Sequence, residues 1–203
     1  SQGSTELTLT GGGATNFESI YGSVGDDIIR GDTGNNVLSG HRGIDTIYGG
    51  GGDDFLGGYR VRASDSEDDH QRTANEDDHN TNDNLYGQAG NDLLVGTIGD
   101  NILDGGTGAD TIYTGSGSDT IVLRAGDGGS TLATADTIAD FTDGTDVLGM
   151  DDGLQYTDLT IAQGTGDNAN DTIISKGSEY LAILTGISAS SLSEADFTPV
   201  DIT

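Results

Sequence analysis

A nine-residue repeat runs through two stretches of this chain, residues 22–57 and 78–122. Each unit joins a glycine-rich turn to a short stretch that suits a β-strand, and its eighth residue is Leu or Ile. The first stretch reads GSVGDDIIR, GDTGNNVLS, GHRGIDTIY and GGGGDDFLG. The second reads DHNTNDNLY, GQAGNDLLV, GTIGDNILD, GGTGADTIY and TGSGSDTIV. Because one turn plus one strand makes half a circuit, two units should complete a circuit, and successive circuits should stack as parallel strands.

The repeat predicts an all-β fold, a parallel β-roll (a β-solenoid with 18 residues per turn) that ends in a β-rich C-terminal cap. We expect residues 1–21 to form an N-terminal cap and residues 22–122 to form the roll. Residues 123–203 should form the C-terminal cap, with strands near 137–141, 159–162, 172–175 and 180–184 and a short helix over 189–197. A polar insertion at 58–77 interrupts the repeat, and the chain forms either one roll through it or two rolls on either side.

The composition excludes several partners and makes an ordinary core hard to build. The net charge is -28, and only seven basic residues are present, so the chain cannot neutralise a useful run of nucleic-acid phosphates. An anionic membrane surface would repel it, and no apolar run is long enough for membrane insertion. Of the acidic residues, 29 are Asp and 6 are Glu. Such a bias is typical of carboxylates that sit in turns or bind a hard cation.

The sixth residue of every unit is Asp or Asn, and stacking places these side chains above one another. Like charges at that spacing need a counter-ion, and a site of carboxylate and carbonyl oxygens without His or Cys suits Ca²⁺. The expected side-chain ligands are Asp27, Asn36, Asp45, Asp54, Asp83, Asp92, Asn101, Asp110 and Asp119. The expected backbone ligands are the fourth-position glycines Gly25, Gly34, Gly43, Gly52, Gly90, Gly99, Gly108 and Gly117.

The number of sites depends on the insertion. In a single roll, the sixth-position side chains pair into four sites on one edge and three on the other, so about seven Ca²⁺ ions are expected. Two separate rolls would lose the Asp45–Asp83 and Asp54–Asp92 pairs and keep five. A further calcium site is conceivable in the acidic C-terminal stretch at Asp136, Asp140, Asp143 and Asp146.

The repeat resembles a known family. The unit GGTGADTIY (residues 105–113) matches G-G-x-G-x-D-x-U-x, the calcium-binding nonapeptide of RTX (repeats-in-toxin) proteins, at every specified place. The stretch DTIADFTDGTDVLGMDDGLQYTDLTI is similar to the segment that closes RTX proteins exported by type I secretion. The resemblance implies a β-roll, calcium-dependent folding outside the cell and an uncleaved C-terminal export signal. Asn36, Asn101, Thr114 and the insertion depart from the pattern.

The expected function is therefore that of a calcium-binding module of a secreted bacterial protein, located extracellularly or at the cell surface. An enzyme is not expected, because the chain contains no H-E-x-x-H, G-x-S-x-G or P-loop motif. Ice binding is disfavoured because the third positions form no regular threonine rank. The alternative is a structural role, in which the open strand edges at the ends of the roll mediate self-assembly into a calcium-dependent filament or surface layer.

Overall fold

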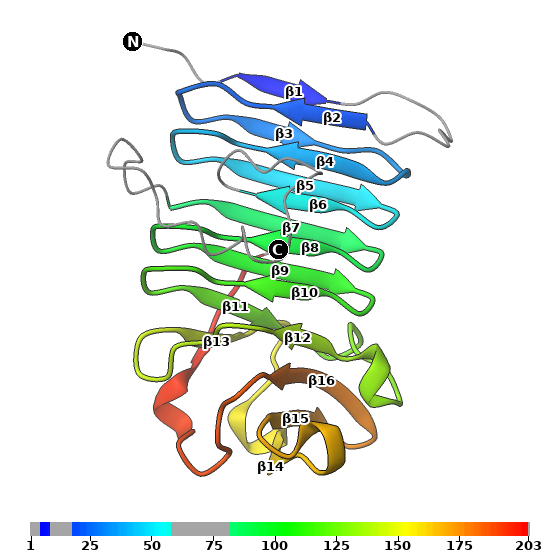
Figure 1. The fold of residues 1–203 in the computed structure, drawn as a ribbon, viewed down its shortest axis with the longest axis vertical. Helices are drawn as coiled ribbons and strands as arrows, with labels where there is room; N and C mark the ends of the chain where they lie inside the picture. Colours follow the sequence, from blue (N-terminus) through cyan, green and yellow to red (C-terminus); the bar gives the residue numbers. More distant parts are fainter. Residues whose placement is uncertain (1–4, 9–17, 58–81, 203) are drawn as a thin grey trace.

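The computed structural model describes residues 5–8, 18–57 and 82–202, so the 58–77 insertion lies outside the described residues. The strands form two sheets that run down the molecule (Figure 1). In order, the first sheet contains β1 (Glu6–Thr8), β3 (Ile28–Arg30), β5 (Thr46–Gly51), β7 (Asn84–Ala89), β9 (Ile102–Thr107), β11 (Thr120–Leu123), β13 (Val147–Met150) and β17 (Phe197–Pro199). The second contains β14 (Thr160–Gln163), β15 (Thr172–Lys176), β16 (Glu179–Leu184), β12 (Asp136–Ile138), β10 (Thr111–Tyr113), β8 (Leu93–Val95), β6 (Phe55–Gly57), β4 (Asn36–Ser39) and β2 (Glu18–Tyr21).

Odd-numbered and even-numbered strands alternate between the sheets, so the chain crosses from one sheet to the other at every turn of the repeat. Neighbouring strands pair in parallel with a register of 18 residues, as Ile29 with Ile47 shows. This arrangement confirms the predicted parallel β-roll. Ile47 pairs with Leu85, a separation of 38 residues, which is one circuit plus 20. The β6–β8 pairing follows the same rule, so a single roll continues past the insertion.

The core is a double ladder of aliphatic side chains between the sheets. Every eighth-position residue is fully buried, as the sequence predicts: Ile29, Leu38, Ile47, Leu56, Leu85, Leu94, Leu103, Ile112 and Ile121. Ile138 and Leu148 continue the ladders into the C-terminal region. Burying each of these side chains contributes roughly 2 kcal/mol. One such residue per nine leaves a narrow core, and the surrounding turns must be stabilised by other interactions.

The C-terminal region extends the roll and then covers its end. β12 and β13 add to the two sheets in parallel, and the antiparallel strands β14, β15 and β16 follow beyond β12. All four strands predicted from the sequence in this region are present within a few residues of the expected positions. The helix predicted over 189–197 is wrong. Only a single 3-10 turn, η5 (Glu194–Asp196), forms there, because Phe197 begins β17 and pairs with Leu148 of β13.

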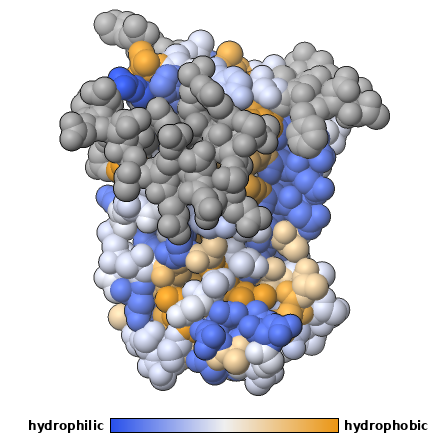
Figure 2. Space-filling view, viewed as in Figure 1, coloured by the Kyte–Doolittle hydropathy of each residue, from blue (hydrophilic) through white to orange (hydrophobic). Residues whose placement is uncertain are grey.

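Three further 3-10 turns connect the C-terminal strands: η2 (Leu132–Thr134), η3 (Tyr156–Asp158) and η4 (Gly166–Asn168). At the N-terminal end, β1 and β2 are the outermost strands of the two sheets. On the face seen in Figure 2, hydrophilic residues gather along the edge of the roll where turns lie. Within the described residues, no helix is long and apolar enough to cross a membrane.

The second residue of the turn adopts left-handed backbone geometry in the central and later units. Glycine fills this place with φ of 107°, 88° and 90° at Gly50, Gly106 and Gly115. His41, Gln88 and Thr97 occupy it with φ of 81°, 78° and 74°. A left-handed conformation costs a non-glycine residue on the order of 1 kcal/mol, and a β-branched residue more. The repeat therefore carries local backbone strain at three of its turns.

We expect Thr97→Gly to raise the free energy of unfolding by about 1 kcal/mol, because relief of strain exceeds the entropy that glycine adds to the unfolded chain. The matched control is Gly106→Ala, at the same place one circuit section later. Its new Cβ would overlap the carbonyl oxygen of Gln88 at a left-handed φ, so it should destabilise. Thermal unfolding with calcium present measures both. A lower melting temperature for Thr97→Gly would contradict the assignment of strain.

Candidate metal sites in the turns

The sixth-position side chains form two buried columns, one along each edge of the roll. One column contains Asp27, Asp45, Asp83, Asn101, Asp119 and Asp146, and the other contains Asn36, Asp54, Asp92, Asp110 and Asp136. In each column, the backbone N–H of one member donates to the side-chain Oδ1 of the member one circuit later, over 2.7–3.1 Å. The structure thus brings together all nine sixth-position side chains in the pairs expected for a single roll.

Asp136 and Asp146 extend the columns into the C-terminal region. They follow their neighbours Asp110 and Asp119 by 26 and 27 residues, so a nine-residue period does not find them. Asp140 has a different place, because its carboxylate accepts hydrogen bonds from the backbone of Thr114 and Gly115. Asp143 is exposed on a turn. Of the four acids considered for an additional site, two therefore join the columns and a third holds the last turn.

The second carboxylate oxygen distinguishes the central members of the columns. Oδ2 is buried and receives no hydrogen bond from the described residues in five of them: Asp45, Asp54, Asp92, Asp110 and Asp119. Each of these oxygens faces the first-position glycine of its own unit or the space beside it. At Gly49, for example, a Cβ would stand 2.5 Å from Asp54 Oδ2 and 2.6 Å from the carbonyl oxygen of Gly87 in the next circuit. The missing side chain leaves room where two oxygens from adjacent circuits converge.

The first two units close this space with a hydrogen bond. The backbone N–H of Ser23 donates to Asp27 Oδ2 over 2.6 Å, and the N–H of Asp32 donates to Asn36 Oδ1 over 2.9 Å. Ser23 and Asp32 occupy the second place of the turn but lack the left-handed φ of later units. The conformation of the second residue thus goes with whether the sixth-position side chain is satisfied by the backbone or keeps an unpartnered oxygen.

The fourth-position glycines lie in stacks along the same edges. Six of them have left-handed φ: Gly43, Gly52, Gly90, Gly99, Gly108 and Gly117. A Cβ at Gly90 would overlap the carbonyl oxygen of Gly52, and one at Gly108 would overlap that of Gly90. The Gly99 carbonyl accepts a hydrogen bond from Asn101 Nδ2 over 3.0 Å, so it lies beside a column member. Close stacking requires glycine here and directs carbonyl oxygens along the stack.

A second ladder, absent from the sequence-based prediction, runs along the exposed side of the turns. Its members are the fifth-position residues Asp26, Asn35, Asp53, Asn82, Asn91 and Asp100, whose Oδ1 atoms accept from the backbone N–H one circuit later over 2.8–3.0 Å. This direction is opposite to that of the buried columns. Asp and Asn alternate freely in it, because only a carbonyl-type oxygen is needed. The Asp-Asp and Asn-Asn pairs of the repeat reveal this ladder once the two roles are known.

Burial raises the pKa of the central carboxyls. Desolvation is the largest cause at Asp45, Asp54, Asp92 and Asp119, and neighbouring like charges add to it, while hydrogen bonds from the column oppose it. The resulting pKa is about 7 for each of these four groups and about 6 for Asp110. At Asp27 burial also raises the pKa, but hydrogen bonds from Ser23 and Thr5 outweigh it and the pKa is lowered.

The chemistry of these turns fits a hard cation that prefers oxygen ligands. Each candidate site offers carboxylate oxygens from two circuits and nearby backbone carbonyls, as Ca²⁺ requires. Among the described residues, no cluster of three or more His, Cys, Asp or Glu side chains has metal-binding geometry. A soft metal held by side chains alone is therefore not indicated there. Two carboxylates with carbonyls are a smaller side-chain set than such a cluster, and the unpartnered Oδ2 atoms are their available ligands.

Comparison with known proteins agrees with this site chemistry. A family model described as "RTX calcium-binding nonapeptide repeat (4 copies)" matches residues 21–56, 80–101 and 95–129. The repeat region therefore belongs to the RTX calcium-binding nonapeptide repeat family, and it is a calcium-binding module. No curated protein matches the chain by sequence.

Among solved structures, the chain is similar to the extracellular lipase LipA from Serratia marcescens, with 17% identity and a TM-score of 0.44. The match covers 91% of this chain but only 40% of the lipase chain. It is also similar to the AlgE6R2 subunit of the Azotobacter vinelandii mannuronan C5-epimerase, with 24% identity and a TM-score of 0.48. That match covers 75% of this chain and 89% of the subunit.

The raised pKa values predict opposite pH responses with and without calcium. Without calcium, the stability that the protonated central carboxyls provide is fully present below about pH 4 and is lost as pH rises through about 7. Calcium needs the ionised carboxylates, so its apparent affinity should fall as pH drops from 8 to 6, on the order of tenfold or more. Circular dichroism during calcium titrations at several pH values measures both trends. A calcium midpoint that does not change with pH would contradict them.

Proposed function

We propose that this chain folds on binding calcium, so that folding of the roll and filling of its turns are one event. The observation that carries the proposal is the pair of buried carboxylate columns with five unpartnered Oδ2 atoms. With net charge -28, the empty columns add repulsion inside the fold to repulsion across its surface. Calcium at ten times its dissociation constant adds about 1.4 kcal/mol per site. Seven such sites would add about 10 kcal/mol, comparable to the stability of a whole domain.

The proposed ions lie between consecutive members of each column. Four pairs on one edge and three on the other give the seven sites expected from the repeat, and the Asp110–Asp136 and Asp119–Asp146 pairs offer two more. The sites that include Asp27 or Asn36 should be weaker, because a backbone N–H already satisfies one of their oxygens. Asn101 should also weaken its sites, since its Nδ2 is a hydrogen-bond donor to Gly99 and Asp119.

We further propose that the protein is secreted and that it folds outside the cell, where calcium is abundant. The resemblance of the C-terminal stretch to the closing segment of type I secreted RTX proteins supports this proposal. We propose no catalytic activity for the module, because metal binding accounts for its buried carboxylates. In this division, residues 22–122 bind calcium, and residues 123–203 end the roll and carry the export signal.

Calcium dependence of folding is the direct test. The chain should be largely disordered in chelator and β-rich in millimolar calcium, because only bound cations offset the buried repulsion. Far-ultraviolet circular dichroism measures the transition, and native mass spectrometry counts the ions. Equal β-sheet signal in both conditions, or two or fewer bound ions, would refute the proposal.

A matched pair of variants localises the effect. Asp92→Asn removes a buried column carboxylate that serves two proposed sites, and Asn36 and Asn101 show that the columns accept the amide. Asp53→Asn changes an exposed carboxylate of the fifth-position ladder and keeps the accepting oxygen. We expect the first variant to raise the calcium midpoint severalfold and lower the ion count by one or two. The second should leave both unchanged.

Export is tested separately from calcium binding. A reporter fused upstream of residues 123–203 should reach the medium when a type I secretion system of the same host is expressed. The same reporter fused to residues 22–122 should stay in the cell. Secretion of both fusions, or of neither, would place the export signal elsewhere without affecting the calcium proposal.

A further inference from the structure

A row of side chains crosses the outer face of the odd-numbered sheet at one register position. Arg30, Tyr48, Tyr86 and Asp104 are direct partners on the consecutive strands β3, β5, β7 and β9. The Arg30 guanidinium lies over the Tyr48 ring, 4.2 Å from its centroid. The two tyrosine rings stack with centroids 5.0 Å apart and planes 13° apart. The row therefore has a cation on one side of an aromatic pair and a carboxylate on the other.

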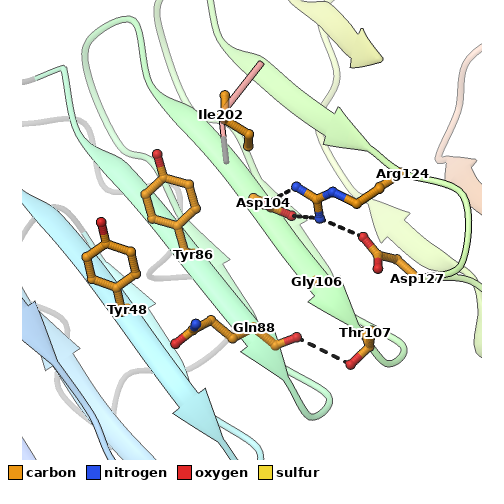
Figure 3. A pocket seen from close by; sticks show the side chains of 9 residues that line it. All are labelled: Tyr48, Tyr86, Gln88, Asp104, Gly106, Thr107, Arg124, Asp127 and Ile202. Atoms are coloured by element: carbon orange, nitrogen blue, oxygen red, sulfur yellow. Dashed lines mark hydrogen bonds and ion pairs between the residues drawn. The ribbon is translucent and has the colours of Figure 1, made fainter. Parts of the chain in front are cut away.

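A cavity of about 340 Å³ lies beside the carboxylate end of this row (Figure 3). Tyr48 and Tyr86 line it from one side, and Asp104, Arg124 and Asp127 line it from the other. This volume falls in the range of small-ligand sites. Calcium binding in the turns does not use it, because its lining residues belong to neither buried column.

The lining of the cavity carries surplus negative charge. Arg124 forms ion pairs with Asp104 and Asp127 at 2.9 and 2.8 Å, and also with Asp151 at 2.8 Å. One guanidinium thus serves three carboxylates, while the whole chain carries -28. Asp127 uses Oδ2 for Arg124, and among the described residues its Oδ1 receives no hydrogen bond. The field in the cavity therefore favours a cation and opposes an anion.

Gln88 adds an independent sign of a binding site. Its side chain lines the cavity, yet its backbone has φ of 78° at a place where other units use glycine. Strain of this kind often accompanies a functional position. The Gln88 amide supplies a polar contact that glycine could not provide.

From this geometry we propose that the cavity binds the guanidinium group of an arginine carried by a basic polypeptide partner. The guanidinium would lie against the Tyr86 side of the aromatic pair, as Arg30 lies on Tyr48, and would donate to Asp127 and Gln88. Arginine combines stacking on an aromatic face with directed donation to a carboxylate, so it fits this lining better than lysine does. The cavity would thus be a docking site on the folded roll, separate from its calcium sites.

The test uses the full chain in excess calcium and a blocked Gly-Arg-Gly peptide, followed by nuclear magnetic resonance titration. The isosteric peptide with citrulline in place of arginine is the neutral control. We expect the arginine peptide to bind at least fivefold more tightly and to shift resonances of Tyr86 and Gln88. Added salt should weaken it. No detectable binding, equal binding of both peptides, or tighter binding of a neutral methyl glucoside would overturn the proposal.

Three variants separate binding from folding. Tyr86→Leu and Asp127→Asn should weaken the arginine peptide about fivefold or more. Tyr113→Leu, on the other sheet, should leave the affinity unchanged. Gln88→Gly should weaken binding while raising the melting temperature, because it removes both the amide and the strained backbone. Circular dichroism in calcium verifies that each variant is folded. Unchanged affinity in the folded Gln88→Gly and Asp127→Asn variants would also contradict the site.

Discussion

Buried repulsion between aspartates controls this structure. A fold that stacks identical turns must stack whatever those turns contain, and here each turn places a carboxylate in the interior of the edge. The columns are well ordered by hydrogen bonds through Oδ1, so the backbone geometry does not depend on a cation for its pattern. The charge on Oδ2 is the unsolved part. Burial answers it with a proton, as the raised pKa values show, and the proposed function answers it with calcium.

The turns at the two ends of the roll differ from those in its centre. At the N-terminal end, backbone N–H groups of Ser23 and Asp32 satisfy the sixth-position side chains. At the C-terminal end, the N–H of Thr142 donates to Asp146 Oδ2, and Thr114 contacts both Asp140 and Asp146. The repeat thus carries its unpartnered oxygens in the middle, where each has a circuit above and below it. Its ends are held by ordinary hydrogen bonds.

The sequence predicts most of the roll because its period is regular. Eighth-position Leu56 and Leu94 and sixth-position Asp54 and Asp92 lie where the spacing places them, even across the insertion. Asp136 and Asp146 could be recognised as acidic but not placed, because the intervening segments are longer than a repeat unit. The 189–197 helix was predicted from local capping signals, and pairing of Phe197 with β13 prevailed over them. The cavity beside Tyr86 combines residues from five separate segments, which no local pattern connects.

The register across the insertion has a consequence for how such a chain can change. Between Gly57 and Asn82 the chain departs from the roll and returns, yet Tyr48 still stacks on Tyr86 and Asp45 still accepts its place in the column before Asp83. Each half-circuit is fixed by its neighbours in space, so the length of chain that joins two of them is nearly free. The junction after β6 is therefore a natural port at which a new loop, epitope or small domain can be grafted while the scaffold stays in phase.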